Sequence, residues 1–214
     1  MNTSSSLVYK VAVSNTRADG LRPALILLHG RGTDEDDLIG LAPSFDPRLL
    51  VVSVRAPYEF AYGGYTWFDL DDGWNLNIDQ LCRSRDALIC CLDEIQKDHP
   101  VDPKKIFLYG FSMGAMMSLV LSLSHPDGFK AIVAHSGMLY EDQGMKYQWE
   151  NLRNLSFFIA HGTYDPVVPV DLGRHSHQKL VRAGANVVYR EYPILHTISD
   201  DSLHDTATWL QRLI

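Results

Sequence analysis

The feature that most constrains the fold of this chain is a regular alternation of short apolar runs with longer helical patterns. The runs in the middle of the chain are almost continuously hydrophobic. Strands have this composition when helices cover both faces of a parallel sheet, because both faces are then buried. The expected strands are Val8–Val13, Ala24–Leu28, Leu50–Val54, Ile106–Tyr109, Ala131–Ala134, Phe157–Ala160 and Val187–Tyr192.

Helical patterns occupy the segments between these runs. In the first of them, apolar residues such as Leu81, Leu88 and Leu92 recur at helical spacing. Ser199 lies where its hydroxyl can cap the last helix. The alternation predicts a single domain over residues 1–214, with a mostly parallel central sheet and helices on both faces. The expected helices are Ile78–Lys97, Ser112–Leu123, Pro169–Ala183 and Asp200–Leu213.

Composition and charge limit the classes of binding partner and the cellular compartment that we expect for this protein. The formal net charge of -7 argues against nucleic acid or an anionic membrane surface as a partner, because both require basic patches. The longest apolar runs are far shorter than the roughly 20 residues of a membrane span. The N-terminus lacks the basic and apolar regions of a signal peptide, so we expect a cytoplasmic protein. Cys82, Cys90 and Cys91 are expected to be buried or half-buried thiols.

Residues 110–114 read Gly-Phe-Ser-Met-Gly and match the Gly-x-Ser-x-Gly pattern of a nucleophile elbow. An expected strand precedes this segment directly, and a helix-forming run follows it. Flanking glycines allow a strand to turn sharply into a helix, which exposes the serine at the carboxyl end of the strand. The context therefore favours Ser112 as a nucleophile over an inert serine in a glycine-rich turn.

A serine hydroxyl needs a base within hydrogen-bond reach, and that base needs an orienting acid. Asp165 lies on the loop after the strand 157–160, at the edge where the sites of open α/β sheets gather. Two competing acids are weaker candidates: Asp171 falls in the following helix, and Asp142 falls in an irregular stretch before the strand. Asp165 is therefore the expected acid.

His196 is the expected base, because it falls on the loop after the last strand, again at the carboxyl edge. His204 lies about two turns into the final helix and is expected to face solvent or core. His175 and His177 share a helix, but a spacing of two residues puts them on different faces, so they make a poor metal-binding pair. No metal site is expected.

The segment 29–33, His-Gly-Arg-Gly-Thr, follows the second expected strand. Its glycines permit a tight turn, so the backbone N–H of Arg31, together with that of Met113, is expected to hold the oxyanion of a tetrahedral intermediate. The His29 side chain is expected to anchor this turn. For the Arg31 side chain, a surface ion pair with Asp34 or Glu35 is favoured over contact with substrate.

The segment 55–77 is long for a connection and unusually aromatic. Long irregular loops in compact domains are usually functional or disordered, and aromatic density argues against disorder. One hypothesis is that Tyr65, Trp67 and Phe68, with Val168 from the loop after Asp165, line a substrate pocket beside Ser112. The equally weighted alternative is a small core that pins the segment to the sheet. The aromatic residues are Tyr58, Phe60, Tyr62, Tyr65, Trp67, Phe68 and Trp74.

These motifs together resemble the phospholipase/carboxylesterase family, which includes small carboxylesterases and acyl-protein thioesterases. The resemblance rests on segments 28–32, 110–114 and 161–169 with the late His196, in order over nearly the whole chain. It implies an α/β-hydrolase without a large cap, no cofactor, and a Ser112–His196–Asp165 triad, and it is compatible with a homodimer. Met113 replaces the Gln usual in thioesterase-like members, and Leu195 replaces the usual Gly before the histidine.

The leading interpretation is a carboxylesterase that cleaves small or medium acyl esters through an acyl-enzyme. An acyl thioesterase or a lysophospholipase would use the same three residues. A catalytically silent binding protein on the same fold is the alternative of a different class. A metal hydrolase is disfavoured, because the histidines do not cluster at ligand spacing.

Overall fold

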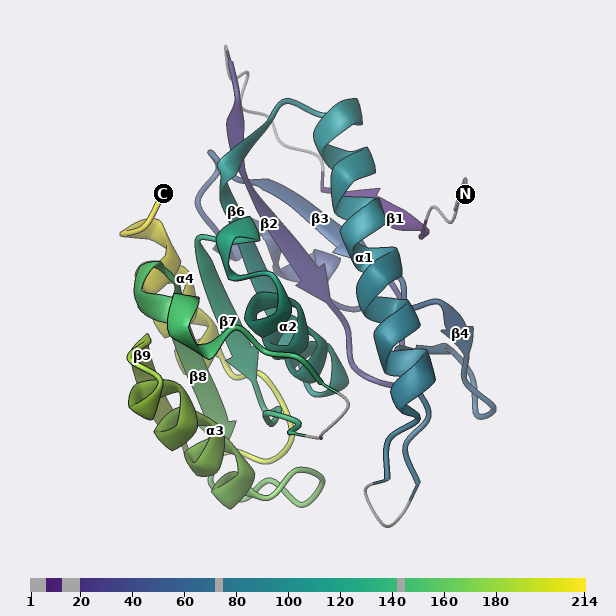
Figure 1. Cartoon of the computed structure of the whole chain (residues 1–214), viewed down its shortest axis with the longest axis vertical. Coiled ribbons are helices and arrows are strands. Elements are labelled where there is room, and N and C mark those ends of the chain that lie inside the picture. Colours follow the sequence, from purple (N-terminus) through teal and green to yellow (C-terminus); the bar gives the residue numbers. More distant parts are fainter. Residues whose placement is uncertain (1–6, 13–19, 72–74, 142–144) are drawn as a thin grey trace.

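A seven-stranded sheet forms the centre of the computed structural model, which describes residues 7–12, 20–71, 75–141 and 145–214 (Figure 1). The strand order is β1-β3-β2-β6-β7-β8-β9. β1 runs antiparallel to β3, and the other neighbouring strands are parallel, which confirms the expected mostly parallel sheet. The strands are β1 (Tyr9–Val11), β2 (Arg22–Leu28), β3 (Leu50–Val54), β6 (Val101–Phe111), β7 (Ala131–His135), β8 (Ser156–Gly162) and β9 (Asn186–Tyr192).

Strand β6 begins five residues before the predicted start at Ile106, and it contains Pro103. Proline cannot donate to a ladder and is tolerated at strand edges. The pairing of β6 with β7 begins only at Phe107, so the segment around Pro103 has no β7 partner on that side. The hydrophobic run alone could not reveal this extension. Val13, the predicted end of the first strand, lies outside the described residues.

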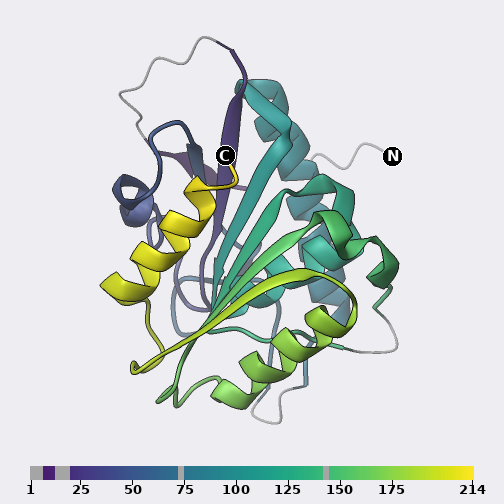
Figure 2. The ribbon, with the colours of Figure 1, turned by 90° about the vertical axis from the view of Figure 1, so that its left-hand side faces the viewer.

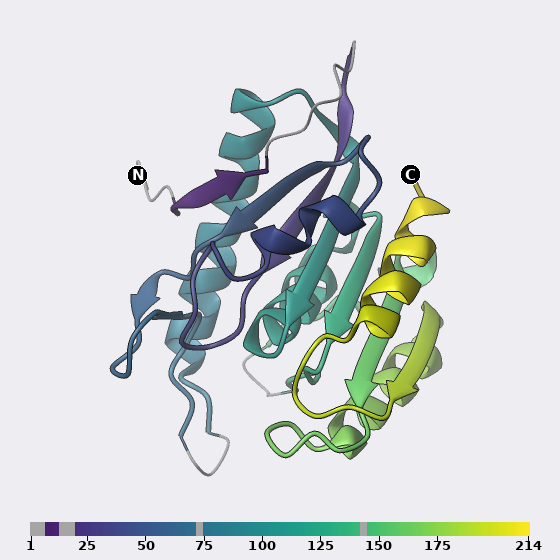
Figure 3. The ribbon, with the colours of Figure 1, turned by 180° about the vertical axis from the view of Figure 1, so that it is seen from behind.

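Helices cover both faces of the sheet, as Figure 2 shows in side view. Helices α1 (Ile78–Asp98), α2 (Met113–Ser124) and α3 (Val170–Arg182) lie on one face, and helix α4 (Asp200–Gln211) with the 3-10 helix η1 (Ile39–Ser44) lies on the other (Figure 3). Because strand residues alternate between faces, Ile26 packs into the first core and Leu27 into the second. Two layers of helix thus bury the apolar runs of the central strands.

Local caps explain where the helices begin. The Asn77 side chain accepts a hydrogen bond from the backbone N–H of Gln80 at 3.1 Å and caps α1. Ser199 and Ser202 form a reciprocal capping box at the start of α4, which confirms the predicted cap. The three cysteines lie in α1 as free thiols, one buried and two half-buried, as expected.

The segment 55–77 is more regular than predicted. It contains a short antiparallel hairpin of β4 (Tyr58–Glu59) and β5 (Tyr65–Thr66). Trp74, one of its aromatic residues, lies outside the described part of the chain, as does Asp142. Two further 3-10 helices, η2 (Pro126–Gly128) and η3 (Trp149–Asn154), flank β7. Within the described ranges, no helix has the length and apolarity needed to cross a membrane.

Candidate active site

Ser112 lies at a strained corner between β6 and α2. Its backbone φ of 54° falls in the left-handed region that non-glycine residues rarely adopt. The flanking glycines allow the corner to pack closely: a Cβ at Gly110 would lie 2.2 Å from the Gly114 carbonyl oxygen, and one at Gly114 would lie 1.9 Å from the Leu28 oxygen. Backbone strain that the surroundings enforce is typical of functional positions. The turn therefore presents the Ser112 side chain at the carboxyl edge of the sheet.

The three residues that the sequence singled out lie in hydrogen-bond contact. The Ser112 Oγ lies 2.9 Å from His196 Nε2, and His196 Nδ1 lies 2.7 Å from Asp165 Oδ2. They follow β6, β9 and β8, respectively, and the carboxyl ends of these parallel strands meet at one edge. An ionised carboxylate can only accept, so Nδ1 carries the proton and Nε2 is free to accept the serine hydroxyl.

Asp165 is held as a carboxylate by three donors. Its Oδ1 accepts the backbone N–H groups of Val167 and Val168 at 2.9 and 2.8 Å, and its Oδ2 accepts from His196. Burial alone would raise the pKa of Asp165, but these hydrogen bonds outweigh that effect and lower its pKa. The group therefore stays charged at neutral pH and can stabilise a protonated imidazole.

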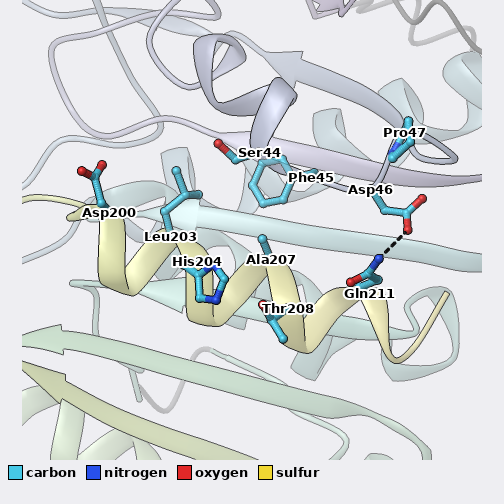
Figure 4. A pocket seen from close by; sticks show the side chains of 10 residues that line it. All are labelled: Ser44, Phe45, Asp46, Pro47, Asp200, Leu203, His204, Ala207, Thr208 and Gln211. Carbon is cyan, nitrogen blue, oxygen red and sulfur yellow. Dashed lines mark hydrogen bonds between the residues drawn. The ribbon is translucent and has the colours of Figure 1, made fainter.

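The competing acid and base are elsewhere. Asp171 lies in α3, exposed, and pairs with Arg174 at 2.9 Å. His204 lies on α4 and lines a different cavity, of about 580 Å³, between that helix and the 44–47 loop (Figure 4). This cavity is larger than the one at Ser112, but Ser112, His196 and Asp165 are not among its lining residues. The candidate site is therefore identified by the hydrogen-bonded arrangement of Ser112, His196 and Asp165 and not by the volume of the cavity.

Two buried histidines support the site, and the sequence interpretation missed both. His161 Nε2 lies 2.8 Å from the Val168 carbonyl oxygen and 3.5 Å from Asp165 Oδ2, so it braces the acid-bearing loop. His135 bonds Ser202, in the first turn of α4, at 3.0 Å. Burial lowers the pKa of His135 to about 3, so the ring is neutral. The one sequence feature that could have indicated them is that each directly follows an apolar run expected to form a buried strand.

The turn after β2 carries the first expected oxyanion donor. His29 is fully buried, and its Nε2 accepts the Ala56 N–H at 3.0 Å, so Nδ1–H donates to the Gly30 oxygen at 2.6 Å. The His29 ring thus anchors the turn, as expected. The Arg31 N–H donates to no acceptor within the described ranges, and that of Met113 is among the unpaired first N–H groups of α2.

The aromatic residues Tyr65, Trp67 and Phe68 do not line the cavity at Ser112, contrary to the pocket hypothesis. Trp67 and Phe68 are completely buried in the main core. The Trp67 Nε1–H donates to the His29 oxygen at 2.9 Å, and the Tyr65 backbone oxygen accepts from Gly32 at 2.8 Å. Trp67 and Phe68 therefore belong to the small core that pins the segment to the sheet, as in the alternative hypothesis. The bonds of Trp67 to His29 and of Tyr65 to Gly32 hold the turn on either side of Arg31.

The favoured ion pair of the Arg31 side chain is also wrong. Glu35 is buried, and both of its oxygens accept from the Arg55 guanidinium at 2.5 Å. The Arg31 Nη1 donates instead to the Leu70 oxygen at 3.3 Å, and its guanidinium carbon lies 5.2 Å from the centre of the Phe60 ring. Folding brings Arg55 to Glu35 from 20 residues away, a partner that sequence proximity could not indicate.

A cavity of about 240 Å³ opens beside the serine. Its wall combines apolar side chains with polar groups in similar measure, and Arg31 and Asp71 supply the charges. Val168 lines it, as the sequence suggested, whereas Leu70, Met116 and Val167 were not anticipated as lining residues. The described lining residues are Arg31, Leu70, Asp71, Ser112, Met113, Met116, Val167 and Val168.

Comparisons with known proteins show similarity over nearly the whole chain. Residues 11–214 match the family described as Phospholipase/Carboxylesterase. The chain is 30% identical to acyl-protein thioesterase 1 of Debaryomyces hansenii, with 98% of this chain and 99% of the relative covered. It is 25% identical to the putative hydrolase MhqD of Bacillus subtilis, over 89% and 93% of the two chains. Its structure superposes on the Bacillus cereus carboxylesterase with a TM-score of 0.86 and 26% identity, over 99% and 97%.

Proposed function

Because this chain belongs to the phospholipase/carboxylesterase family of α/β-hydrolases, we propose that it is a serine carboxylesterase acting on esters with small or medium acyl groups. The observation that carries the proposal is the continuous hydrogen-bonded series from Ser112 through His196 to Asp165, with separations of 2.9 and 2.7 Å. A nucleophile, a base and an orienting acid in this order are what acyl transfer to serine requires.

In the first half of the reaction, Ser112 Oγ attacks the ester carbonyl as His196 Nε2 takes its proton. Asp165 stabilises the resulting imidazolium. The carbonyl oxygen becomes an oxyanion, which the N–H groups of Arg31 and Met113 would hold; one such donor is typically worth about 100- to 1,000-fold in rate. His196 then gives its proton to the leaving alkoxide oxygen, which leaves an acyl-enzyme and a free alcohol.

In the second half, water attacks the acyl-enzyme. His196 removes a proton from the water, and the new oxyanion uses the same two N–H groups. Collapse of this intermediate breaks the bond to Ser112, whose Oγ recovers its proton from His196. The products are a carboxylic acid, an alcohol and the unchanged enzyme, so this chemistry needs no cofactor.

The size of the cavity supports small or medium acyl groups. Its volume of about 240 Å³ lies below the range of about 300–1,000 Å³ for pockets that enclose drug-sized ligands. The apolar side chains of Met116, Val167 and Val168 suit a short hydrocarbon chain. A long fatty acyl chain would extend beyond this cavity, so we expect activity to fall as the chain lengthens.

Acyl thioester hydrolysis is the second candidate, favoured by relatives that are named acyl-protein thioesterase 1. Met113 occupies the position where thioesterase-like members carry Gln, which favours the ester substrate instead. A lysophospholipase would use the same groups. A panel of p-nitrophenyl esters of graded length, beside an acyl thioester and a lysophospholipid, separates these activities by kcat/KM, and the highest value on a thioester or lysophospholipid would replace our assignment.

Covalent labelling tests the enzyme proposal directly. A fluorophosphonate probe should label the folded wild-type protein at Ser112, and Ser112→Ala should abolish the labelling. His196→Ala should lower kcat by several orders of magnitude, whereas the matched control His204→Ala should leave it nearly unchanged. No labelling of folded wild-type protein would support the silent binding protein, and a larger effect of His204→Ala would overturn the choice of base.

A further inference from the structure

Arg31 carries a guanidinium group at the cavity that contains the proposed nucleophile. Arginine has five N–H donors, and the structure shows one of them in use, from Nη1 to the Leu70 oxygen at 3.3 Å. The Phe60 ring lies under the group, 5.2 Å from the guanidinium carbon. Within the described ranges, no carboxylate pairs with Arg31. The guanidinium is therefore held in place at the cavity without an ion pair to any carboxylate of the described residues.

The carboxylates closest in sequence or on the same cavity wall are engaged elsewhere. Glu35 binds Arg55 through both oxygens, and Asp34 Oδ1 accepts the backbone N–H of Asp36 at 2.9 Å. Asp71 accepts from the backbone N–H of Asn75 at 2.9 Å and from its side-chain amide at 3.0 Å. Among the described residues, the Leu70 oxygen is the one acceptor that the Arg31 side chain contacts, so further N–H groups of Arg31 can serve a ligand in the cavity.

We propose that Arg31 binds a carboxylate at the far end of the acyl group, so that the preferred substrates are half-esters of short dicarboxylic acids. This inference rests on the proposed esterase function. Ser112 and Arg31 line the same cavity, and Leu70, Met116 and Val168 supply an apolar wall. An acyl chain attached at Ser112 can therefore cross apolar surface and present its terminal carboxylate to the guanidinium.

The planar guanidinium suits this role because it can donate two parallel hydrogen bonds to one carboxylate. The contacts with Phe60 and Leu70 limit its motion before substrate binds, which lowers the entropic cost of recognition. The reaction is the hydrolysis already described: Ser112 attacks the ester carbonyl, the alcohol leaves with a proton, and water releases the dicarboxylic acid. Arg31 contributes charge and orientation through its side chain and transfers no proton.

A matched substrate pair isolates the side-chain charge. p-Nitrophenyl pentanoate and the p-nitrophenyl half-ester of glutaric acid have acyl chains of equal length, and only the second ends in a carboxylate. The ratio of their kcat/KM values, half-ester over pentanoate, should fall about tenfold in Arg31→Gln, mainly through KM. The backbone N–H of residue 31 serves both substrates, so a disturbed oxyanion site changes both values and leaves the ratio unaltered.

Arg48→Gln is the matched control. Arg48 pairs with Asp46 before β3, at the opposite end of the strands, and its removal should not change the ratio. In the wild type, the ratio should also fall as salt rises from about 0.05 to about 0.5 M, because ions screen the attraction. An unchanged ratio in Arg31→Gln, or a wild-type ratio insensitive to salt, overturns the role of Arg31. Absence of turnover on both esters by the wild type would instead refute the esterase proposal.

Discussion

Trp67→Phe tests whether the aromatic segment braces the oxyanion turn or shapes the substrate pocket. The substitution keeps an aromatic ring but removes the indole N–H that donates to the His29 oxygen at 2.9 Å. Trp67 is completely buried, so the carbonyl would lose its partner in a site without water. That loss costs about 1–3 kcal/mol, and three fewer buried heavy atoms cost about 2 kcal/mol more.

The expected destabilisation is therefore about 3–5 kcal/mol. For a chain of this length, each kcal/mol lowers Tm by about 2–4 °C, so Tm should fall by about 10 °C. Urea and thermal unfolding measure this loss. Because Trp67 does not line the cavity, the relative kcat/KM values across p-nitrophenyl esters of increasing length should stay the same, even if all of them decrease.

Tyr62→Phe is the matched control in the same hairpin. Tyr62 is 90% exposed, so its variant should change stability by less than about 0.5 kcal/mol. The reasoning would be refuted if Trp67→Phe unfolded like the wild type while its preference among acyl lengths shifted. That result would mean that the ring shapes the pocket and that the turn does not depend on it.

Three further outcomes follow from the site and its supports. Asp165→Asn should lower kcat by about 10⁴-fold with the fold intact, since an amide no longer selects the reactive tautomer; steady-state kinetics with circular dichroism measure this, and a loss below tenfold would contradict the assignment. Gly114→Ala should destabilise by more than about 4 kcal/mol, because its Cβ would lie 1.9 Å from the Leu28 oxygen, whereas Gly128→Ala, with nothing within 4 Å, should be nearly neutral in urea unfolding. Burial lowers the pKa of His135 to about 3, so the stability that the neutral ring contributes is complete above about pH 6.5 and is lost as pH falls. Between pH 7 and pH 5, this loss is about 2 kcal/mol of unfolding free energy. Urea titrations at the two pH values should show a correspondingly smaller decrease for His135→Asn.

Much of the architecture was predictable from local pattern. The apolar runs located the strands of the sheet. The two glycines around Ser112 indicated a close strand-to-helix crossing, and the structure shows that a Cβ at either position would clash with backbone atoms. Asp165 and His196 could be singled out because each follows an expected strand at its carboxyl end. Parallel strands carry such loops to one edge, so order along the chain was sufficient to nominate the three residues.

The ion-pair partners and the role of the aromatic segment depended on contacts between residues that are far apart in the sequence. The sequence suggested an ion pair between Arg31 and Glu35 because the two residues are close along the chain. In the folded protein, Glu35 pairs with Arg55 instead, and the Arg31 side chain lines the cavity. Aromatic density in 55–77 fitted both a pocket and a core, and only the packing of Trp67 against the His29 turn decided between them.

The sequence by itself therefore determined the kind of fold, the sharp turn at Ser112, and the choice of Asp165 and His196 as candidate acid and base. These features follow from apolar periodicity, from glycine spacing and from the order of loops after strands, all of which can be read along the chain. Only the tertiary structure decided which side chains face the cavity and which carboxylate neutralises which cation. These outcomes depend on three-dimensional distances between residues far apart in the chain, and an ion pair or hydrogen bond is gained or lost over a few tenths of a nanometre.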